Sequence, residues 1–441
     1  MRDPGMQALR LIARPAIWHL NIRSIMARSS ASEAVPARFA GWSVAWVAFV
    51  VAVFAWGVGF HGLGVLLHSL HETRGWSIAV ISAAITTHFL GGAAIIVFLP
   101  EVHRAFGLAA TTICGAAFTA AGIVGWSMAI APWQLFIAAL ISGGGWAVTS
   151  GAAINAMVAP WFDRDRPKAI GLAFNGASVA GIVFPPLLVQ GTASIGLQMT
   201  AILVAIAVLL VVGSLAHFYL RKVPADLGLT ADGGLPVMPR REPAPVQRLP
   251  RSSLIRTREF QTLSAAFALA LFAQVGLLSH LLTRVSPVFG ASGAALVVSL
   301  TTISAVAGRT LLGWLIGDHD RRIAACGNFL VQSVGVGLIC ISDTPSAVLV
   351  GCALFGLGVG NVVSLPTLIA QKEFRSPDVG TVVALVVAIN QAVFALAPAV
   401  LGAIRDVTAS YTLPFAIGIA AQIMASFIVL VGRRHRAADE G

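Results

Sequence analysis

Long apolar runs, separated by short charged segments, make up most of this chain. A helix needs about 20 apolar residues to cross a bilayer core of about 30 Å, and every run reaches that length. The runs cover residues 39–71, 75–100, 105–162, 169–220, 260–283, 285–317, 323–342, 344–371, 379–404 and 407–432. Two of them are long enough for two crossings each, with turns expected at residues 131–133 and 191–196. The pattern therefore predicts twelve transmembrane helices.

One long polar segment, residues 221–258, divides the apolar runs into two sets of six. It is rich in Pro, Gly and charged residues, which leaves too little apolar surface for a core of its own. We expect it to be a cytosolic connector between two helix bundles, residues 40–220 and 259–433. Residues 1–39 and 434–441 are expected to be basic cytosolic tails.

Composition supports an integral membrane protein. Hydrophobic residues make up 57% of the chain and charged residues 11%, whereas soluble domains carry about 25% charged residues. The four cysteines stand singly within apolar runs, so neither a disulfide framework nor a zinc site is indicated. We expect no metal and no cofactor.

Lys and Arg set the expected orientation because they accumulate in cytosolic loops. If both termini are cytosolic, only Arg74, Arg284 and Arg405 of the 29 Lys and Arg lie outside, and Arg309 lies within a run. We therefore predict a multi-pass protein of the cell membrane with both termini in the cytosol. The net charge of +11 then follows from this bias, and a nucleic-acid partner is not expected.

The two apolar halves carry similar landmarks in the same order, which indicates an internal repeat. The first half has Phe54-Ala55 before His61 and Asn175 before Pro185; the second has Phe272-Ala273 before His280 and Asn390-Gln391 before Pro398. The predicted fold class is an all-α membrane protein with two pseudo-symmetric six-helix bundles.

The stretch that closes the eighth predicted helix resembles a loop motif of the major facilitator superfamily. Residues 308–318 read Gly-Arg-Thr-Leu-Leu-Gly-Trp-Leu-Ile-Gly-Asp. The matching segment of the first half, residues 100–107, has His103 where the motif has an Asp. The resemblance covers the chain from Ala40 onward and implies the twelve-helix fold. It also implies charge pairs that hold a cytosolic gate, mainly through the second copy of the motif. The gate residues it implies are Arg104, Asp318, Asp320, Arg321 and Arg322.

Other short phrases resemble the monocarboxylate-porter branch of that superfamily. They are Gly-Trp-Ser at residues 75–77, the segment 223–229, and Ile-Asn-Gln at residues 389–391. In that branch an Arg of helix eight pairs with the substrate carboxylate, and Arg309 stands at this place. A Lys in helix one also serves the branch, and His61 aligns with it. The branch's Asp one turn before the Arg is Ala305 here, which disfavours a proton relay through an Asp–Arg pair.

Arg309 is informative without the resemblance. A cation within a transmembrane helix costs about 2.5–3.5 kcal/mol on insertion scales, so it faces a wet cavity or a partner. The predicted spans hold no Asp or Glu, and a planar guanidinium suits a carboxylate. A transported anion would supply the missing charge. The alternative is that the Arg309 side chain extends toward Asp318 or Asp320 at the membrane surface.

Two interpretations stay open for the polar residues of the other spans. An imidazole titrates near pH 6.5, so His61 is a candidate for proton coupling or substrate contact; a neutral His bonded to a backbone carbonyl is the alternative. His280, its counterpart in the repeat, is a weaker candidate. Asn390, Gln391 and Asn175 either contact the substrate or hydrogen-bond between helices.

Motifs of other functional classes are missing. The sequence has no GxSxG, HExxH or phosphate-binding GxxxxGK[ST] pattern, which argues against hydrolysis and ATP-driven transport. We predict a secondary transporter, functional as a monomer, that moves a small organic anion together with a proton; the resemblance implies a monocarboxylate. The alternatives are export of a hydrophobic or drug-like compound and a membrane sensor that does not transport.

Overall fold

The computed structural model describes residues 39–233, 249–317, 319–375 and 377–433. The chain divides into two compact units, Met1–Ala40 and Gly41–Gly441, and the second unit holds all the helices described below. Most of the two predicted tails, part of the central connector and the gate residue Asp318 lie outside the described residues. The predicted division into two bundles stays a prediction.

The first half of the second unit holds the first six crossings. Its helices are α2 (Gly41–Trp56), η1 (Gly57–His61), α3 (Gly62–Arg74), α4 (Ile78–Ile96), α5 (Leu99–Met128), α6 (Pro132–Thr149), α7 (Gly151–Val158), α8 (Arg166–Ile195) and α9 (Leu197–Tyr219). The turns expected at residues 131–133 and 191–196 fall where α5 meets α6 and α8 meets α9. Gly196 allows the second turn because its φ of 83° is one that side chains disfavour.

The second half holds the remaining crossings and the described parts of the connector. They are η2 (Pro224–Leu227), η3 (Ala231–Gly233), α10 (Arg251–Ile255), α11 (Arg258–Leu315), α12 (Arg321–Ile341), α13 (Pro345–Glu373), α14 (Val379–Phe394), α15 (Ala397–Thr408) and α16 (Thr412–Val431). Below, "first half" means α2 to α9 and "second half" means α10 to α16.

Within the described residues, eleven helices or helix runs are long and apolar enough to cross a membrane. One of them, α11, has 58 residues and leaves helical geometry at Gly290, with φ of 68°. Both of its arms pack against α13: Phe260 shares a core cluster with Ile369, and Gly308 lies against Leu357. Because α11 is a hairpin of two crossings, the described residues form the twelve crossings that the sequence predicted.

Two predicted loops are wrong in detail. The turn expected at Arg284 lies six residues later, and the Arg284 guanidinium donates to the Ile339 carbonyl at 2.7 Å and the Asp343 carboxylate at 2.8 Å. The loop expected around Arg104 is helical, because α5 begins at Leu99 and breaks only at Gly107. In both cases the charged residue lies within a helix, a few residues before the turn.

The eleventh crossing, which we call helix eleven, is divided into α14 and α15. Pro398 has no N–H to bond the carbonyl of Phe394, and just before it the Leu396 N–H donates to the carbonyl of Val393, three residues back, in place of the usual four. The division lies near the middle of the crossing. Because of this division, α14 and α15 can run in different directions.

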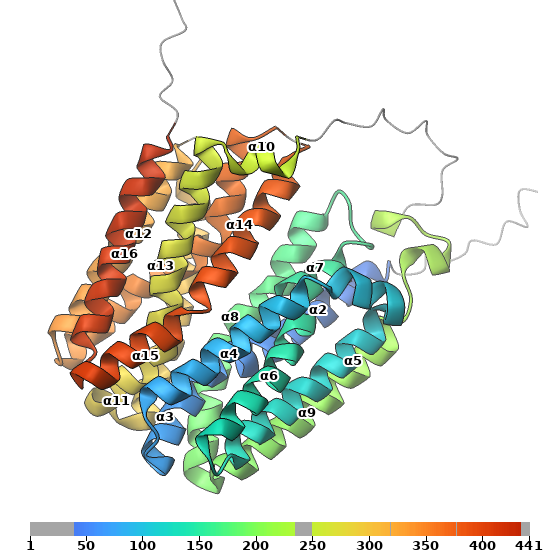
Figure 1. Ribbon diagram of the computed structural model, residues 1–441. Coiled ribbons are helices and arrows are strands. Elements are labelled where there is room, and N and C mark those ends of the chain that lie inside the picture. The colour runs from blue at the N-terminus through green and yellow to red at the C-terminus, as the bar shows by residue number, and fades with distance from the viewer. Residues whose placement is uncertain (1–38, 234–248, 318, 376, 434–441) are drawn as a thin grey trace, which may run out of the picture. The chain divides into compact units, whose positions relative to one another are not determined.

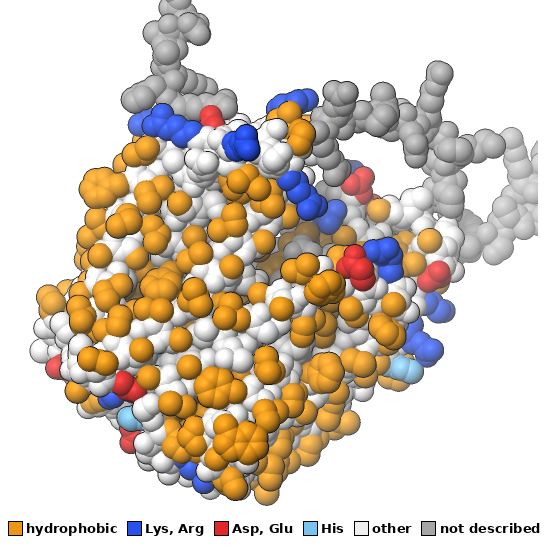
Figure 2. Space-filling model, viewed as in Figure 1, with side chains coloured by type: hydrophobic (Ala, Val, Ile, Leu, Met, Phe, Trp, Pro, Cys, Tyr) orange, Lys and Arg blue, Asp and Glu red, His pale blue; other side chains and the backbone are white. Residues whose placement is uncertain are grey.

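The halves meet at one end of the second unit (Figure 1). There α3 packs against α11, and α4 against α15; we call this the far end. The other end carries η2, η3 and α10, and we call it the central-loop end. Figure 1 shows the first-half helices, blue to green, diverging from the second-half helices toward the central-loop end. Figure 2 shows the surface hollowed between them on that side.

Candidate substrate site between the two halves

A widened turn in the first crossing positions His61. Residues Gly57–His61 form a π-helical turn, and the N–H of Gly62 donates to the Gly57 carbonyl. A side chain at Gly57 would overlap the ring of Phe184, so glycine allows this close approach. Such single π-turns occur often at functional sites. Apart from its glycines, no local pattern predicts this turn.

A small cavity lies beside this turn, and both halves line it. The first half contributes Phe60, His61, Gly64, Val65, Phe89 and Pro185, and the second half Leu278, Ser279, Leu282 and Val298. Only two of these side chains are polar. The Ser279 hydroxyl donates to the Val275 carbonyl at 2.8 Å, which leaves the imidazole of His61 as the polar side chain of the lining that can donate to a ligand.

Gly181 of α8 brings His61 close to the second half. A methyl group at Gly181 would lie 2.6 Å from both His61 Nε2 and Thr302 Oγ1. The next contact along the same two helices is direct, since the Ser299 hydroxyl donates to the Ile182 carbonyl at 2.7 Å. His61 therefore lies where the halves touch, opposite the second arm of α11.

Arg309 lies two turns after Thr302, on the same face of α11. Its guanidinium presses on α13, because a Cβ at Gly360 would lie 3.0 Å from Arg309 Nε and 3.1 Å from Nη2. Arg309 Nε is buried and has no hydrogen-bond partner among the residues the structure describes. Of the two acids proposed as its partner, Asp320 instead binds Arg433 at 2.6 Å, and Asp318 is not described.

The three amide side chains that were predicted as possible substrate contacts differ in burial. Asn390 is buried and Gln391 half-buried on α14; Asn390 Oδ1 and Gln391 Nε2 have no hydrogen-bond partner within the described part of the chain. Asn175 is exposed on α8, two turns before Ile182, so it lies on the face that α8 turns toward α11. The Asn390 oxygen and the Gln391 nitrogen can therefore still accept and donate hydrogen bonds.

His280 is held differently. It is fully buried, with Nε2 3.2 Å from the Pro398 carbonyl and Nδ1 3.5 Å from the Tyr411 hydroxyl. These contacts join α11 to α15 and to the start of α16. The ring is therefore placed for interhelical bonding, and it does not line the cavity with His61.

One buried histidine, His88, makes side-chain contacts that the sequence did not indicate. His88 Nδ1 lies 2.8 Å from the Ser142 hydroxyl, which also accepts from Trp126 Nε1 at 3.2 Å. His88 Nε2 is buried next to Gly59 of the π-turn. Its partner is 54 residues away, so no local pattern revealed the cluster.

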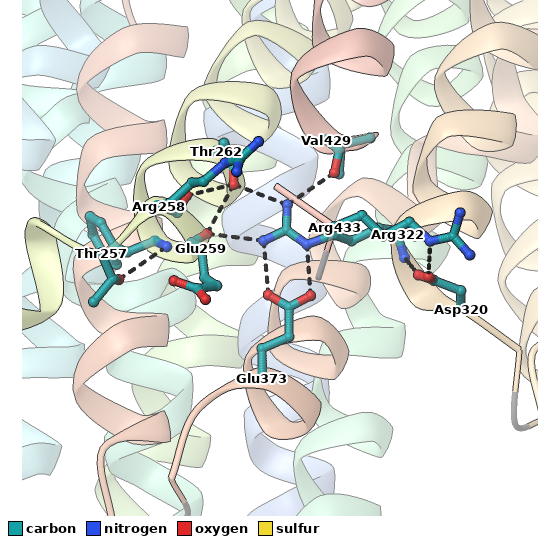
Figure 3. Close-up of polar contacts among 10 residues, drawn as sticks. Thr257, Arg258, Glu259, Thr262, Asp320, Arg322, Glu373, Val429 and Arg433 are labelled. Atoms are coloured by element: carbon teal, nitrogen blue, oxygen red, sulfur yellow. Dashed lines mark hydrogen bonds and ion pairs between the residues drawn. The ribbon is translucent and has the colours of Figure 1, made fainter. Parts of the chain in front are cut away.

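Among the predicted gate residues, Arg322 has the most contacts (Figure 3). Its Nε and Nη2 bind the two carboxylate oxygens of Glu373 at 2.6 and 2.8 Å. The remaining N–H groups donate to Thr262 Oγ1, the Val429 carbonyl and the Glu259 carbonyl at 3.0–3.1 Å. A guanidinium has five N–H donors, and all are used. The contacts join α11, α12, α13 and α16, all of the second half.

Asp320 begins α12 beside this cluster. One carboxylate oxygen accepts from the Arg322 backbone N–H at 2.8 Å and the other from Arg433 Nε at 2.6 Å. Partial burial alone would raise the pKa of Asp320, but these hydrogen bonds outweigh it and hold the pKa below the usual carboxyl value. The carboxylate is thus kept charged at the central-loop end.

The other gate candidates make fewer contacts. Arg104 forms an exposed ion pair with Glu101 of its own helix at 3.1 Å. Arg321 Nε is buried without a hydrogen-bond partner in the described part of the chain. The ion pairs that Arg104, Lys168, Arg322 and Arg433 form at the central-loop end each lie within one half.

Comparison with known proteins agrees with this arrangement. Residues 39–398 match the sequence profile of the Major Facilitator Superfamily. Mouse monocarboxylate transporter 11 is 24% identical over 415 residues, covering 88% of this chain and 87% of its own. A probable actinorhodin transporter of Streptomyces coelicolor is 27% identical over 249 residues, covering 54% of this chain and 39% of its own.

Solved structures share the fold at lower identity. The nucleoside transporter NupG has a TM-score of 0.65 at 12% identity, covering 89% of this chain and all of its own. A bacterial homolog of the human lysosomal transporter Spinster, inward-facing and unoccupied, has a TM-score of 0.65 at 14% identity, covering 91% of this chain and all of its own. With its twelve helices and the profile match over most of its length, this chain is a member of the Major Facilitator Superfamily, a family of transporters and not of enzymes.

Proposed function

We propose that this secondary transporter carries a small organic anion, a monocarboxylate, together with a proton. The observation that carries the proposal is Arg309, whose Nε is buried in the membrane part of the fold without a hydrogen-bond partner among the described residues. A carboxylate satisfies a guanidinium with two parallel hydrogen bonds. Binding would remove the cost of the isolated cation.

Other polar residues of the two halves are assigned to the same transport cycle. His61 lies across the interface near Thr302, which precedes Arg309 by two turns on the same face of α11. We assign the coupling proton to His61 because imidazole titrates in the physiological range. Asn390, Gln391 and Asn175 would supply neutral hydrogen bonds to the substrate, and His280 a structural contact.

The orientation is part of the proposal. Lys and Arg concentrate at the central-loop end, so we assign that end to the cytosol. The halves then meet on the outside and diverge toward the cytosol, which corresponds to an inward-facing state. Transport would alternate this state with its opposite by rocking residues 40–220 against residues 259–433. Arg104, Asp318, Asp320, Arg321 and Arg322 would then stabilise one of the two states on the cytosolic side.

Uptake into proteoliposomes tests the proposal. The assay uses labelled lactate, pyruvate and longer monocarboxylates, with and without an inward proton gradient. We expect saturable uptake that the gradient stimulates and that Arg309→Gln abolishes. Lys168→Gln is the control, since its ion pair with Asp165 is exposed. No uptake of any carboxylate by folded protein would refute the proposal.

A second candidate function is export of a larger hydrophobic compound. The cavity at His61 is lined mainly by apolar and aromatic side chains, and one relative is described as a probable actinorhodin transporter. An exporter of this kind would not require the cation. Efflux of a drug-like dye that persists in Arg309→Gln, with no carboxylate uptake by the unmodified protein, would favour this function.

A further inference from the structure

At the far end, a carboxylate of the second half binds the start of a first-half helix. Asp406 of α15 accepts a hydrogen bond from the backbone N–H of Ala79 at 2.8 Å. Ala79 is in the first turn of α4, whose own cap, Ser77, accepts from Val80 at 3.3 Å. The first N–H groups of a helix have no partner within it and carry a partial positive charge. Asp406 therefore satisfies one of them across the boundary between the halves.

The position of Asp406 is fixed by its neighbours. Arg405 Nη1 lies 3.2 Å from Asp406 Oδ1, and the Arg405 guanidinium stacks 5.7 Å above the centre of the Tyr411 ring. Arg405 and Tyr411 both belong to the second half. One carboxylate oxygen of Asp406 is thus anchored in its own half and the other reaches across.

This contact begins a continuous seam between α4 and helix eleven. The two helices run antiparallel, so successive contacts lie at higher residue numbers in α4 and at lower residue numbers in helix eleven. After Ala79 and Asp406 come Ser82 against Gly402, the Thr86 hydroxyl accepting from the Ala399 N–H at 3.1 Å, and the rings of Phe89 and Phe394 with centres 5.8 Å apart. We call these four contacts the α4/α15 seam.

The seam ends where helix eleven divides. Phe394 is the last residue of α14, and the break before α15 follows it directly. Beyond the break α14 packs mainly against α11, and only slightly against α4. The seam therefore closes the far end alone, with the break at one end of it and Asp406 at the other.

We propose that Asp406 is a latch: its hydrogen bond to the Ala79 N–H holds the α4/α15 seam, and with it the far end, closed. When the far end opens, α4 and α15 must separate, and the Ala79 N–H loses its partner. The charged hydrogen bond then favours the state in which the far end is closed. This inference concerns the motion of the two halves and does not depend on which substrate they carry.

Electron–electron distance measurements on the full-length protein in lipid nanodiscs test the latch. The four native cysteines are replaced by alanine, and spin labels are placed at Arg74→Cys and Leu413→Cys, which are exposed positions at the far end of either half. We expect Asp406→Asn to raise the open-to-closed ratio about tenfold, the typical strength of a charge-assisted hydrogen bond. Asp406→Ala should raise it further, because it also removes the acceptor oxygen.

Asp343→Asn is the matched control. Its carboxylate lies at the same end but binds Arg284 of its own half at 2.8 Å, so the distances should not change. Gly402→Ala tests the seam at a second point, since a methyl there would overlap Ser82, and it should also favour the open state. If Asp406→Asn and Asp406→Ala both give the unmodified distance distribution, Asp406 is not a latch.

Discussion

The guanidinium of Arg322 binds both carboxylate oxygens of Glu373, at 2.6 and 2.8 Å, and its side chain is 1% exposed. This pair ties α12 to α13 at the central-loop end, where the sequence had implied a charged gate that includes Arg322 but not Glu373 as its partner. Because both residues belong to the second half, the pair is a structural support for that half.

We expect Arg322→Gln to destabilise the protein by about 3–5 kcal/mol, because removing one partner of a buried ion pair leaves the other uncompensated. The unfolding temperature in detergent measures the effect. Arg104→Gln is the control, since an exposed pair contributes at most about 1 kcal/mol. Equal unfolding temperatures for both variants would contradict a supporting role for Arg322.

Close helix contact predicts opposite effects at two glycines of α11. A methyl group at Gly308 would overlap the backbone carbonyl of Leu357, whereas nothing lies within 4 Å of one at Gly313. We expect Gly308→Ala to cost about 1–3 kcal/mol through overpacking. Gly313→Ala should be neutral or stabilise by up to about 1 kcal/mol. Unfolding temperatures of the two variants, measured side by side, check the prediction.

Asp320 gives a prediction about pH. Its hydrogen bonds to Arg322 and Arg433 lower its pKa in the folded protein. Such a carboxylate stabilises the fold above the pKa of the unfolded chain, near 3.9, and this contribution is lost as the pH falls through the lower folded value. Asp320→Asn should therefore reduce the unfolding temperature at pH 7, and the difference should shrink as the pH falls below about 4. A difference that is constant down to pH 3 would contradict the assignment.

The shape of the side chain at position 309 is a further test of the proposed site. Lysine keeps the positive charge but loses the planar fork that binds a carboxylate. We expect Arg309→Lys to lower kcat/KM for carboxylate uptake about tenfold or more, the cost of one good hydrogen bond to a charged group. If Arg309→Lys transports as well as the unmodified protein, charge alone is sufficient and bidentate binding is ruled out.

The crossings were predictable because the bilayer sets their length and composition, as at α4, α9 and α12. The exact turns were not. The charge of Arg284 marks a loop in the pattern, yet its long side chain reaches back to the Ile339 carbonyl and the helix continues past it. The π-turn that ends at His61 depends on the packing of Gly57 against Phe184, which no local pattern records.

The candidate site was predictable only in part, for the same reason. Arg309 stood out because a lone charge interrupts an apolar run. His88 and Asp406 did not, since the partners that give them a role lie 54 and 327 residues away in the sequence. A residue that is costly to bury, such as a charge in an apolar run, can be recognised in the sequence. A residue whose role depends on a partner far away in the chain can be recognised only in the folded structure.

The proposed role of His61 predicts how pH affects uptake. If this imidazole carries the coupling proton, uptake should fall as the external pH rises from about 6 to about 8, across the usual imidazole range. In His61→Gln the ring is gone, so uptake driven by the anion gradient should persist but no longer respond to pH. His280→Gln is the matched control, because His280 bonds to Pro398 and Tyr411 between helices and should leave the pH profile unchanged. Initial uptake rates over this pH range separate the two histidines. If His61→Gln keeps the unmodified pH profile, a group other than His61 carries the coupling proton. Loss of uptake on substitution of Arg309 would then still support anion transport.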